Sequence, residues 1–380
     1  MKCILKNGIF LLWNNNEFIL ECRDALIDNH ILCGWNKDLC ADKVYDLAGK
    51  TIVPSFFNIH CHLGEMFYRE ICKPDWNVEK YIETTETAND QLSPEEREIR
   101  WNRSAVLTID ELLSNGITGL AAGRSAIPCK KKSMFNMCGY PLMKSNKLKT
   151  FTPTIEKFQL YKSEYESERC KVGILLHSLY MTDEAMLNFA RIAMTTGIAE
   201  FFTTHISEDG ETRNKEIMKY GEPPVNVLAS FNLLTDKSIL VHCGYTSKEE
   251  LYLLAEKGVI VAVCPISNKF LSSCMPNLYL LEHLSIKWCI ATDGPATGRT
   301  LSITKQLSYA KKQFPQISDE VFFLSITQRP GEVYDCPYYN GKIEIGTEAS
   351  FNIINKMYGD AREVLSDLVQ DAVSYRLHRF

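Results

Sequence analysis

Pro54-Ser-Phe-Phe-Asn-Ile-His60-Cys-His62-Leu-Gly-Glu65 is the stretch that decides the fold. It follows a β-type run from Leu47 to Val53, and it contains the only His-x-His in the sequence. Residues i and i+2 of a strand point to the same face, so His60 and His62 would present two imidazoles side by side. Such a pair suits a metal ion, but it also fits buried histidines that are satisfied by hydrogen bonds. The metal interpretation therefore requires further ligands from the rest of the chain.

The composition is that of an ordinary globular protein, with 380 residues of which 45% are hydrophobic and 23% are charged. The net charge of −5 gives no basic footprint for nucleic acid, and the short run Lys130-Lys131-Lys132 is typical of a solvated loop. No apolar run reaches the roughly 18 residues that would span a membrane. We therefore expect neither a nucleic-acid partner nor a membrane partner.

The N-terminal residues favour strands over a signal peptide. Their short apolar runs are broken by Lys6 and Asn7, and no small-residue cleavage site follows. The 14 cysteines are scattered without any Cys-x-x-Cys pair, which argues against a zinc ribbon or a thioredoxin-like motif. These features predict a protein with reduced cysteines in the cytoplasm.

The pattern of secondary structure changes near residue 51. Residues 1 to 50 favour short strands joined by turns, whereas β-like runs then alternate with helical ones, as in parallel βαβ units. Ser93, Pro94 and the acids that follow predict the start of a helix that ends near Asn115. Further helices are predicted at Asp183–Thr196 and Ser247–Lys257, and further strands at Gly341–Gly346 and Ala349–Ile354.

Eight candidate strands lie between about residues 51 and 330. They are the run that ends at His60–His62, Ile117–Ala122, Met137–Met143, Val172–Leu176, Phe201–Thr204, Ser238–Val241, Val259–Val263 and Trp288–Thr292. This count predicts an α/β fold, a (β/α)8 TIM barrel over residues 51–330. Residues 1–50 and 331–380, from both chain termini, would form a small β-sandwich domain.

Polar residues stand at the predicted ends of several of these strands, where a barrel of this type carries its active site. They are His60 and His62, His177, His205, His242 and Asp293. Satisfied core histidines become the poorer explanation when so many coincide. Three histidines and one aspartate could hold one divalent ion and leave a position for water or substrate. In Thr204-His205-Ile-Ser-Glu208, a carboxylate three residues after a ligand could serve proton transfer, although this motif taken alone is better explained by a solvated loop glutamate.

In this order and spacing, the motifs resemble the amidohydrolase superfamily. His-x-His, His-x-x-Glu, His-Cys and Thr-Asp-Gly follow one another as in its branch of metal-dependent deaminases and chlorohydrolases. That branch contains adenosylhomocysteine/methylthioadenosine deaminase, guanine deaminase and triazine hydrolases. DLAGKTIVPSFFNIHCHLGE looks like the entry into the barrel, VAVCPISNKFL like the seventh-strand segment, and GKIEIGTEASFNII like the return to the small β domain.

The resemblance implies one divalent metal ion, Zn2+ in the first place with Fe2+ or Mn2+ as alternatives. Its ligands would be His60, His62, His205 and Asp293. Water activated by the ion would attack an amino-bearing carbon, Glu208 would shuttle the proton, and ammonia would leave. His242 would orient the water, and His242 and Asp293 could accept its proton.

The substrate side is less determined. The resemblance implies that His177 binds substrate, together with an acid after the first strand, for which Glu86 is preferred over Glu83. The usual Gly after the barrel-entry Pro is Ser55 here, and residues Gly116–Ser125 lack the common Thr-x-x-Asp ending. Arg124 in that segment fits a surface ion pair or the recognition of a carboxylate, phosphate or carbonyl equally well. Ser125–Lys149 has no clear counterpart, and the last small-domain strands look abbreviated.

The implied function is hydrolytic deamination of a heterocycle such as a purine, pterin, pyrimidine or nucleoside-like molecule. Hydrolysis of a C–Cl bond or of a cyclic amide or imide at the same centre is the alternative. A non-catalytic binding member of the fold is the interpretation from another class, and it is disfavoured because all four ligand positions and Glu208 are present. The resemblance is also compatible with a homodimer.

Overall fold

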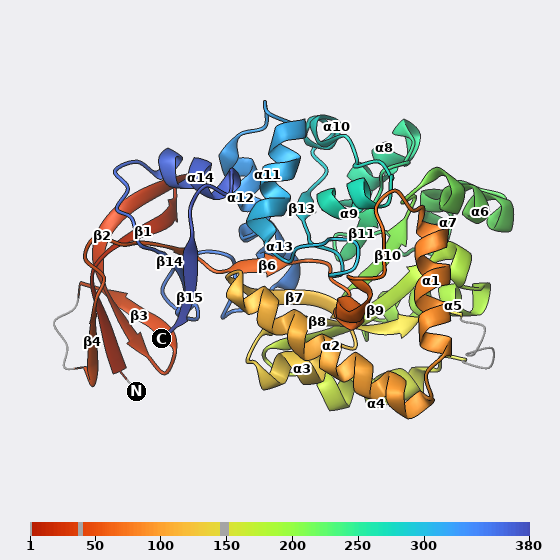
Figure 1. The fold of residues 1–380 in the computed structure, drawn as a ribbon, viewed down its shortest axis with the longest axis horizontal. Helices are drawn as coiled ribbons and strands as arrows, with labels where there is room; N and C mark the ends of the chain where they lie inside the picture. Colours follow the sequence, from red (N-terminus) through yellow and green to blue (C-terminus); the bar gives the residue numbers. More distant parts are fainter. Residues whose placement is uncertain (1, 37–40, 145–151) are drawn as a thin grey trace. The chain divides into compact units, whose positions relative to one another are not determined.

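A computed structural model describes residues 2–36, 41–144 and 152–380 (Figure 1). The chain divides into two compact units. The first contains Met1–Asn58, Asp110–Gly119 and Ser302–Phe380, and the second contains Ile59–Ile109 and Leu120–Leu301. Every residue predicted to form the site lies in the second unit. Residues 145–149 of the segment without a clear counterpart lie outside the described residues.

Eight strands form one sheet in chain order, and each strand pairs with its neighbours in the sequence. They are β6 (Phe56–Asn58), β7 (Ile117–Gly123), β8 (Phe135–Leu142), β9 (Cys170–Ser178), β10 (Phe202–Ile206), β11 (Ser238–His242), β12 (Ile260–Val263) and β13 (Trp288–Ile290). The pairs from β8 to β13 are parallel. Helices follow the strands and surround this nearly closed barrel, which confirms the predicted fold class (Figure 1).

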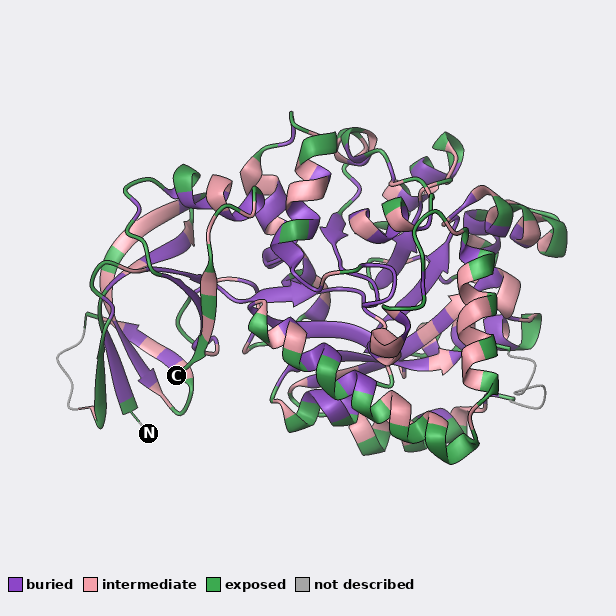
Figure 2. Ribbon diagram, in the orientation of Figure 1, coloured by how far each residue is buried: buried purple, intermediate pink, exposed green. Residues whose placement is uncertain are grey.

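The barrel strands are buried nearly throughout, as Figure 2 shows. All residues of β10, β11, β12 and β13 are buried. A parallel sheet that helices cover is buried on both faces, so its strands read as continuous apolar runs rather than alternating ones. The polar residues that interrupt these runs at strand ends therefore stand out in the sequence.

The helices begin and end where capping residues predict. Ser93 accepts a hydrogen bond from the Glu96 amide at 3.2 Å, while the Glu96 carboxylate accepts one from the Ser93 amide at 2.7 Å. The helix that they start ends before Gly116, whose φ of +74° suits a residue without a Cβ. Ser247 and Glu250 form the same reciprocal cap at the helix predicted there. Within the described residues, no helix combines the length and the apolar character needed to cross a membrane.

Helices, several of them only one or two turns long, connect the strands along the chain. They are η1 (Leu63–Tyr68), α1 (Val78–Asp90), α2 (Pro94–Ser114), α3 (Ala126–Lys131), α4 (Ile155–Tyr165), η2 (Leu179–Met181), α5 (Glu184–Thr195), α6 (Gly210–Tyr220), α7 (Pro224–Ser230), α8 (Lys248–Lys257), α9 (Pro265–Phe270), α10 (Leu278–His283), α11 (Ile303–Gln313), α12 (Asp319–Leu324), α13 (Gln328–Tyr334) and α14 (Ala361–Val369).

The β unit is built from both chain ends, as predicted, and its strands form one mixed sheet. The order is β15-β14-β5-β1-β2-β3, with β4 paired to β1. The strands are β1 (Lys2–Asn14), β2 (Glu17–Asp28), β3 (Ile31–Trp35), β4 (Lys43–Asp46), β5 (Thr51–Pro54), β14 (Ser350–Ile354) and β15 (Tyr375–Arg379). Phe10 from the N-terminal part and Phe351 from the C-terminal part pack in one core, with ring centroids 6.3 Å apart. Burial of these apolar side chains joins the two chain ends.

One predicted strand is wrong. Residues 341–346 form a loop, in which Gly341 and Gly346 have φ values of +75° and +98° that interrupt an extended chain. The loop buries Ile343 in the core of the β unit and leaves Ile345 58% exposed. The alternation of apolar and polar residues therefore came from a loop that buries one side chain, not from a strand.

Candidate active site

The His-x-His pair lies just beyond the first barrel strand rather than on it. β6 ends at Asn58, before the predicted end at His60–His62. The Cys61 amide nevertheless donates a hydrogen bond to the Ala121 carbonyl of β7 at 3.1 Å. This bond holds the segment alongside β7, and His62 has the extended φ and ψ of −102° and 108°. The two imidazoles can therefore converge as alternate residues of a strand would.

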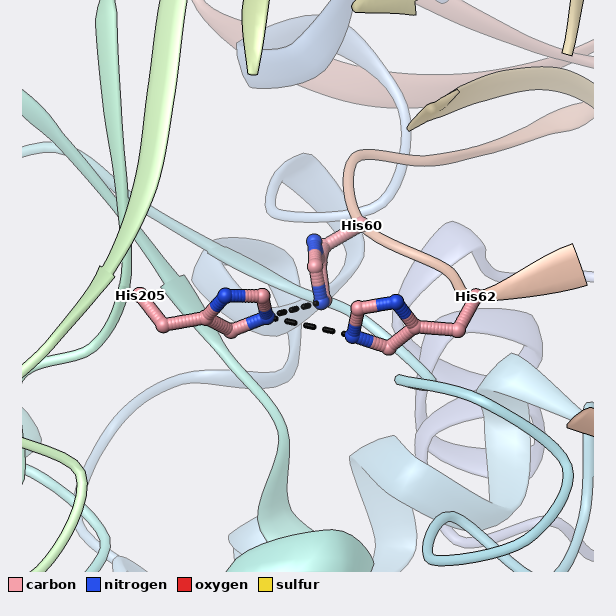
Figure 3. Close-up of side chains that lie close together, drawn as sticks. All are labelled: His60, His62 and His205. Atoms are coloured by element: carbon pink, nitrogen blue, oxygen red, sulfur yellow. Dashed lines mark hydrogen bonds between the residues drawn. The ribbon is translucent and has the colours of Figure 1, made fainter. Parts of the chain in front are cut away.

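Three imidazoles meet at the C-terminal ends of the barrel strands (Figure 3). The Nε2 atom of His205 lies 3.2 Å from that of His60 and 3.1 Å from that of His62. His205 comes from β10, so residues 145 positions apart in the chain are brought into contact. His60 and His205 are buried, and His62 is partly exposed. The structure thus brings together the three predicted histidine ligands.

The backbone of His177 orients the His205 ring. The His205 Nδ1 atom lies 2.7 Å from the His177 carbonyl oxygen, which can only accept a hydrogen bond. A neutral ring that donates from Nδ1 has a free lone pair on Nε2, the atom that faces the other two imidazoles. Burial lowers the pKa of His205 well below its ordinary value, so the neutral ring is favoured. The pairing of β9 with β10 is shifted at this point, with His205 opposite Ser178, and His177 is the extra residue.

Asp293 completes the cluster. Its Oδ1 atom lies 3.3 Å from the Nε2 atoms of both His60 and His62. Its Oδ2 atom accepts hydrogen bonds from the hydroxyls of Ser267 at 2.5 Å and Thr297 at 2.8 Å. Burial alone would raise the pKa of Asp293, but the neighbouring imidazoles hold it well below its usual value. The carboxylate is therefore ionised, with one oxygen anchored and the other aimed at the histidines.

These four groups fit a divalent metal ion. Ligand atoms about 2.0–2.1 Å from a tetrahedral ion are roughly 3.3 Å from one another. The contacts that join the four ligand atoms measure 3.1–3.3 Å. Asp293 Oδ1 is buried and has no hydrogen-bond donor among the described residues. The Asp293 Oδ1 atom and the lone pair on His205 Nε2 face the same small space. This arrangement is unfavourable, and a cation bound there would stabilise it.

Glu208 and His242 form a second pair next to the cluster. The Glu208 Oε1 atom lies 3.4 Å from the Nε2 atom of His242, and both side chains are largely buried. Burial, reinforced by the charge of Asp293, raises the pKa of Glu208 well above its ordinary value. Burial lowers the pKa of His242 to about 4. Its Nδ1 atom is 3.4 Å from the Asn268 amide nitrogen, which holds the ring from behind.

Several residues at the strand ends have a left-handed backbone that only glycine adopts freely. They are Arg124, Ser207, His242, Cys243 and Asp293, with φ between 48° and 72°. Each costs on the order of 1–3 kcal/mol unless the surroundings hold it, and such residues gather at functional sites. Sharp turns here redirect the chain just beyond β7, β10, β11 and β13. No pattern in the sequence predicts them.

The histidine cluster opens into a cavity of ≈ 480 Å³, which is a typical size for a small-molecule site. His177, Glu86 and Arg124 line it, as do His62, His205, Glu208, His242 and Asp293. Glu83 does not line this cavity, and its carboxylate pairs with Lys80 at 2.8 Å on the exposed face of α1. This geometry agrees with the preference for Glu86 over Glu83, and a substrate contact by either residue stays a prediction.

Arg124 forms the ion pair that one of its two interpretations predicted. Its guanidinium donates to both carboxylate oxygens of Glu98, at 3.0 and 2.8 Å, and lies 4.2 Å from the centre of the Trp101 ring. Glu98 and Trp101 come from α2, and all three residues line the cavity. The charge of Arg124 is therefore already paired. A contact between Arg124 and substrate remains a prediction.

Sequence reasoning assigned no role to four residues of the site. Ser267 and Asn268 lie in the segment VAVCPISNKFL, so a signal was present, but it did not reveal that they hold Asp293 and His242. Thr297 follows Asp293 by four residues in a loop without a pattern. Glu65 closes the opening stretch, lines the cavity and has one buried carboxylate oxygen without a hydrogen-bond partner among the described residues. Burial raises its pKa to about 7.

A barrel with a histidine and carboxylate cluster at its strand ends is an arrangement found in metal-dependent hydrolases. Residues 51–377 match the amidohydrolase family, and the chain belongs to that family. The family expected from the sequence motifs is thus confirmed. Membership also confirms the expected enzyme class, a hydrolase of C–N bonds other than peptide bonds.

Individual relatives are distant. A 5-methylthioadenosine/S-adenosylhomocysteine deaminase of Acetivibrio thermocellus is 27% identical over 336 residues, which cover 82% of this chain and 74% of that protein. A zinc-bound adenosine deaminase of Xanthomonas campestris superposes with a TM-score of 0.85 at 17% identity, covering 98% and 90% of the two chains. Guanine deaminase of C. acetobutylicum, solved with guanine bound, gives 0.81 at 17% identity and 99% coverage of each chain. At this identity the structural likenesses establish the fold.

Proposed function

We propose that this chain is a metal-dependent hydrolytic deaminase of a nitrogen heterocycle, such as a purine, pterin, pyrimidine or nucleoside. One observation carries the proposal. The buried carboxyl of Glu208 lies beside His242 on the wall of the same cavity that the candidate ligands His62, His205 and Asp293 line. The names of the relatives, which are deaminases of adenine nucleosides and of guanine, support the choice of leaving group.

His60, His62, His205 and Asp293 would hold the ion. A bound divalent ion supplies Lewis-acid activation of a water molecule. Zinc has the best support, because a structural neighbour carries it, while Fe2+ and Mn2+ are compatible with histidine and aspartate ligands. His205 is held in turn by the His177 carbonyl, and Asp293 by the Ser267 and Thr297 hydroxyls.

The remaining residues handle protons and orientation. Glu208 accepts one proton of the attacking water and passes it to the ring nitrogen next to the reacting carbon. It then transfers the second proton, from the newly formed hydroxyl, to the leaving amine. His242 and Asp293 orient the water, while His177 and Glu86 contact the heterocycle. In the net reaction, a C–NH2 group and water are converted to a carbonyl group and ammonia. A carboxyl with a raised pKa suits this role, because it must both take and return a proton.

The experiment is ammonia release from a panel of adenosine, 5′-methylthioadenosine, guanine, cytosine and a pterin by enzyme reloaded with zinc, iron or manganese. Ammonia released in equal amount to the carbonyl product supports the proposal. A second panel of chlorinated heterocycles and cyclic imides is scored for chloride and ring opening. Either product without ammonia would replace the deaminase proposal by the alternative hydrolase.

A non-catalytic binding role is tested by metal analysis. The proposal expects about one equivalent of a tightly held divalent ion per chain after reloading and desalting. Much less than one equivalent, together with no turnover on either panel, would favour a binding protein.

A further inference from the structure

Two arginines of α2 line the cavity and have no carboxylate partner among the residues that the structure describes. Arg97 and Arg100 are three residues apart, so they lie on the same face of the helix. Both belong to the wall of the ≈ 480 Å³ cavity. Within the described ranges, neither guanidinium forms an ion pair, and the buried Nε atom of Arg97 has no hydrogen-bond acceptor. Both residues differ in this from Arg124, which is paired with Glu98.

Aromatic rings hold Arg100 in place without neutralising it. Its guanidinium lies 4.7 Å from the centre of the Tyr68 ring and 5.7 Å from that of Phe67. Stacking on an aromatic face orients the planar guanidinium and leaves its N–H donors in the ring plane for a ligand. An arginine that is oriented in this way loses less conformational entropy when an anion binds.

The acids of the cavity wall are mostly engaged elsewhere. Glu208 faces His242, Asp293 faces His60 and His62, and Glu98 pairs with Arg124. One carboxylate oxygen of Glu65 is buried and has no hydrogen-bond partner among the described residues. Among the described residues, Glu65 and Glu86 form no ion pair, and neither of them pairs with Arg97 or Arg100. A buried donor without an acceptor, such as Arg97 Nε, costs free energy that a bound anion would recover.

We propose that Arg97 and Arg100 bind an anionic group, a carboxylate or a phosphate, on a substituent of the heterocycle. The inference rests on the proposed function, because it places the reacting ring at the histidine cluster and the substituent toward α2. It makes the substrate class a heterocycle with an anionic substituent. A planar guanidinium pairs with either group through two parallel N–H···O bonds.

The test measures binding rather than turnover, on zinc-loaded protein that carries Glu208→Gln to prevent reaction. Calorimetry compares two matched pairs, 5′-carboxymethylthio-5′-deoxyadenosine with 5′-methylthioadenosine for the carboxylate, and adenosine 5′-monophosphate with adenosine for the phosphate. The anionic member of at least one pair should bind at least about 10-fold more tightly, as expected for hydrogen bonds to a charged group. The pair that shows the preference identifies which anion is recognised.

Arg97→Gln and Arg100→Gln should each weaken binding of that anionic probe about 10- to 100-fold and change the neutral probe by less than about threefold. Arg97→Lys should retain part of the preference, because it keeps the charge but not the paired donors. Arg103→Gln is the matched control. Arg103 lies on the same helix and over the same Phe67 ring at 5.6 Å, but it is exposed and does not line the cavity. Thermal unfolding and zinc content verify that each variant is folded and loaded.

Three results would overturn the inference. They are equal binding of both members in both pairs, no binding of any probe, and a preference that Arg97→Gln and Arg100→Gln disturb no more than Arg103→Gln does. Ammonia release by the wild-type enzyme is measured separately. A deaminase without the anion preference would refute only the inference, whereas the preference without ammonia release would refute only the deaminase proposal.

Discussion

The Nδ1 atom of His205 lies 2.7 Å from the backbone carbonyl oxygen of His177. This single contact makes His177 part of the site through its main chain, whatever its side chain does. It places the free lone pair of His205 on Nε2, toward His60 and His62. Because the donor of this hydrogen bond is a candidate ligand, the irregular pairing of β9 and β10 helps to shape the proposed metal site.

Metal content is the first prediction. Purified and reloaded protein should hold about one equivalent of a divalent ion, and His205→Ala should hold less than about a tenth of that after desalting, because a three-ligand remnant binds much more weakly. Elemental analysis gives the measurement. His283→Ala, at an exposed histidine of the same unit, is the control and should bind as the wild type does. Full occupancy in His205→Ala would remove His205 from the ligand set.

Glu208→Gln should retain the metal and lose turnover by about 10²- to 10⁴-fold, the usual contribution of a group that transfers protons. The glutamine has nearly the same shape, so the cavity and the neighbouring His242 are preserved. Ammonia release and elemental analysis on the same preparation separate the two effects. Glu211→Gln, at an exposed acid three residues later, should leave both turnover and metal content unchanged. A fully active Glu208→Gln enzyme would rule out the proposed proton shuttle.

Ser267→Ala and Thr297→Ala should each weaken metal binding by about 10- to 100-fold, because their hydroxyls anchor the Asp293 oxygen that faces away from the histidines. Competition with a chelator measures the affinity. The exposed Ser272→Ala serves as the control. Unchanged affinity in both variants would mean that backbone packing alone positions Asp293.

Glu216 should make stability depend on pH. It is 1% exposed in α6, its Oε2 atom lacks a described hydrogen-bond partner, and burial raises its pKa to about 8. Between about pH 4.5, the ordinary value of the group, and about pH 8, the folded state binds a proton that the unfolded state has released. The contribution of Glu216 to stability therefore falls as the pH rises through this window.

Replacement by Glu216→Gln removes that dependence. The stability of the variant relative to wild type, from urea unfolding, should increase from pH 5 to pH 8. Glu222→Gln, at an exposed site, should show no such trend. A difference between Glu216→Gln and wild type that stays constant over this range would show that the Glu216 pKa is unshifted.

Much of the fold could be predicted because its signals are local. The eight barrel strands, the helix caps at Ser93 and Ser247 and the helix end at Gly116 follow from short stretches of sequence. The loop at 341–346 was mistaken for a strand, because apolar alternation also arises when a loop buries one side chain. β6 ends before His60, so the histidine pair lies beyond the strand and not on it as predicted. The imidazoles converge all the same.

The sequence by itself determined the barrel and the identity of the candidate ligands. Parallel strands place their carboxyl ends at one rim, so strand-end His60, His62, His205 and Asp293 had to gather there. Only the tertiary structure decided how these groups are held and what else faces the cavity. The Ser267 and Thr297 bonds to Asp293, the pairing of Arg124 with Glu98 and the position of Arg97 and Arg100 on the cavity wall are examples. They depend on distances between segments far apart in the chain, which short-range patterns do not encode.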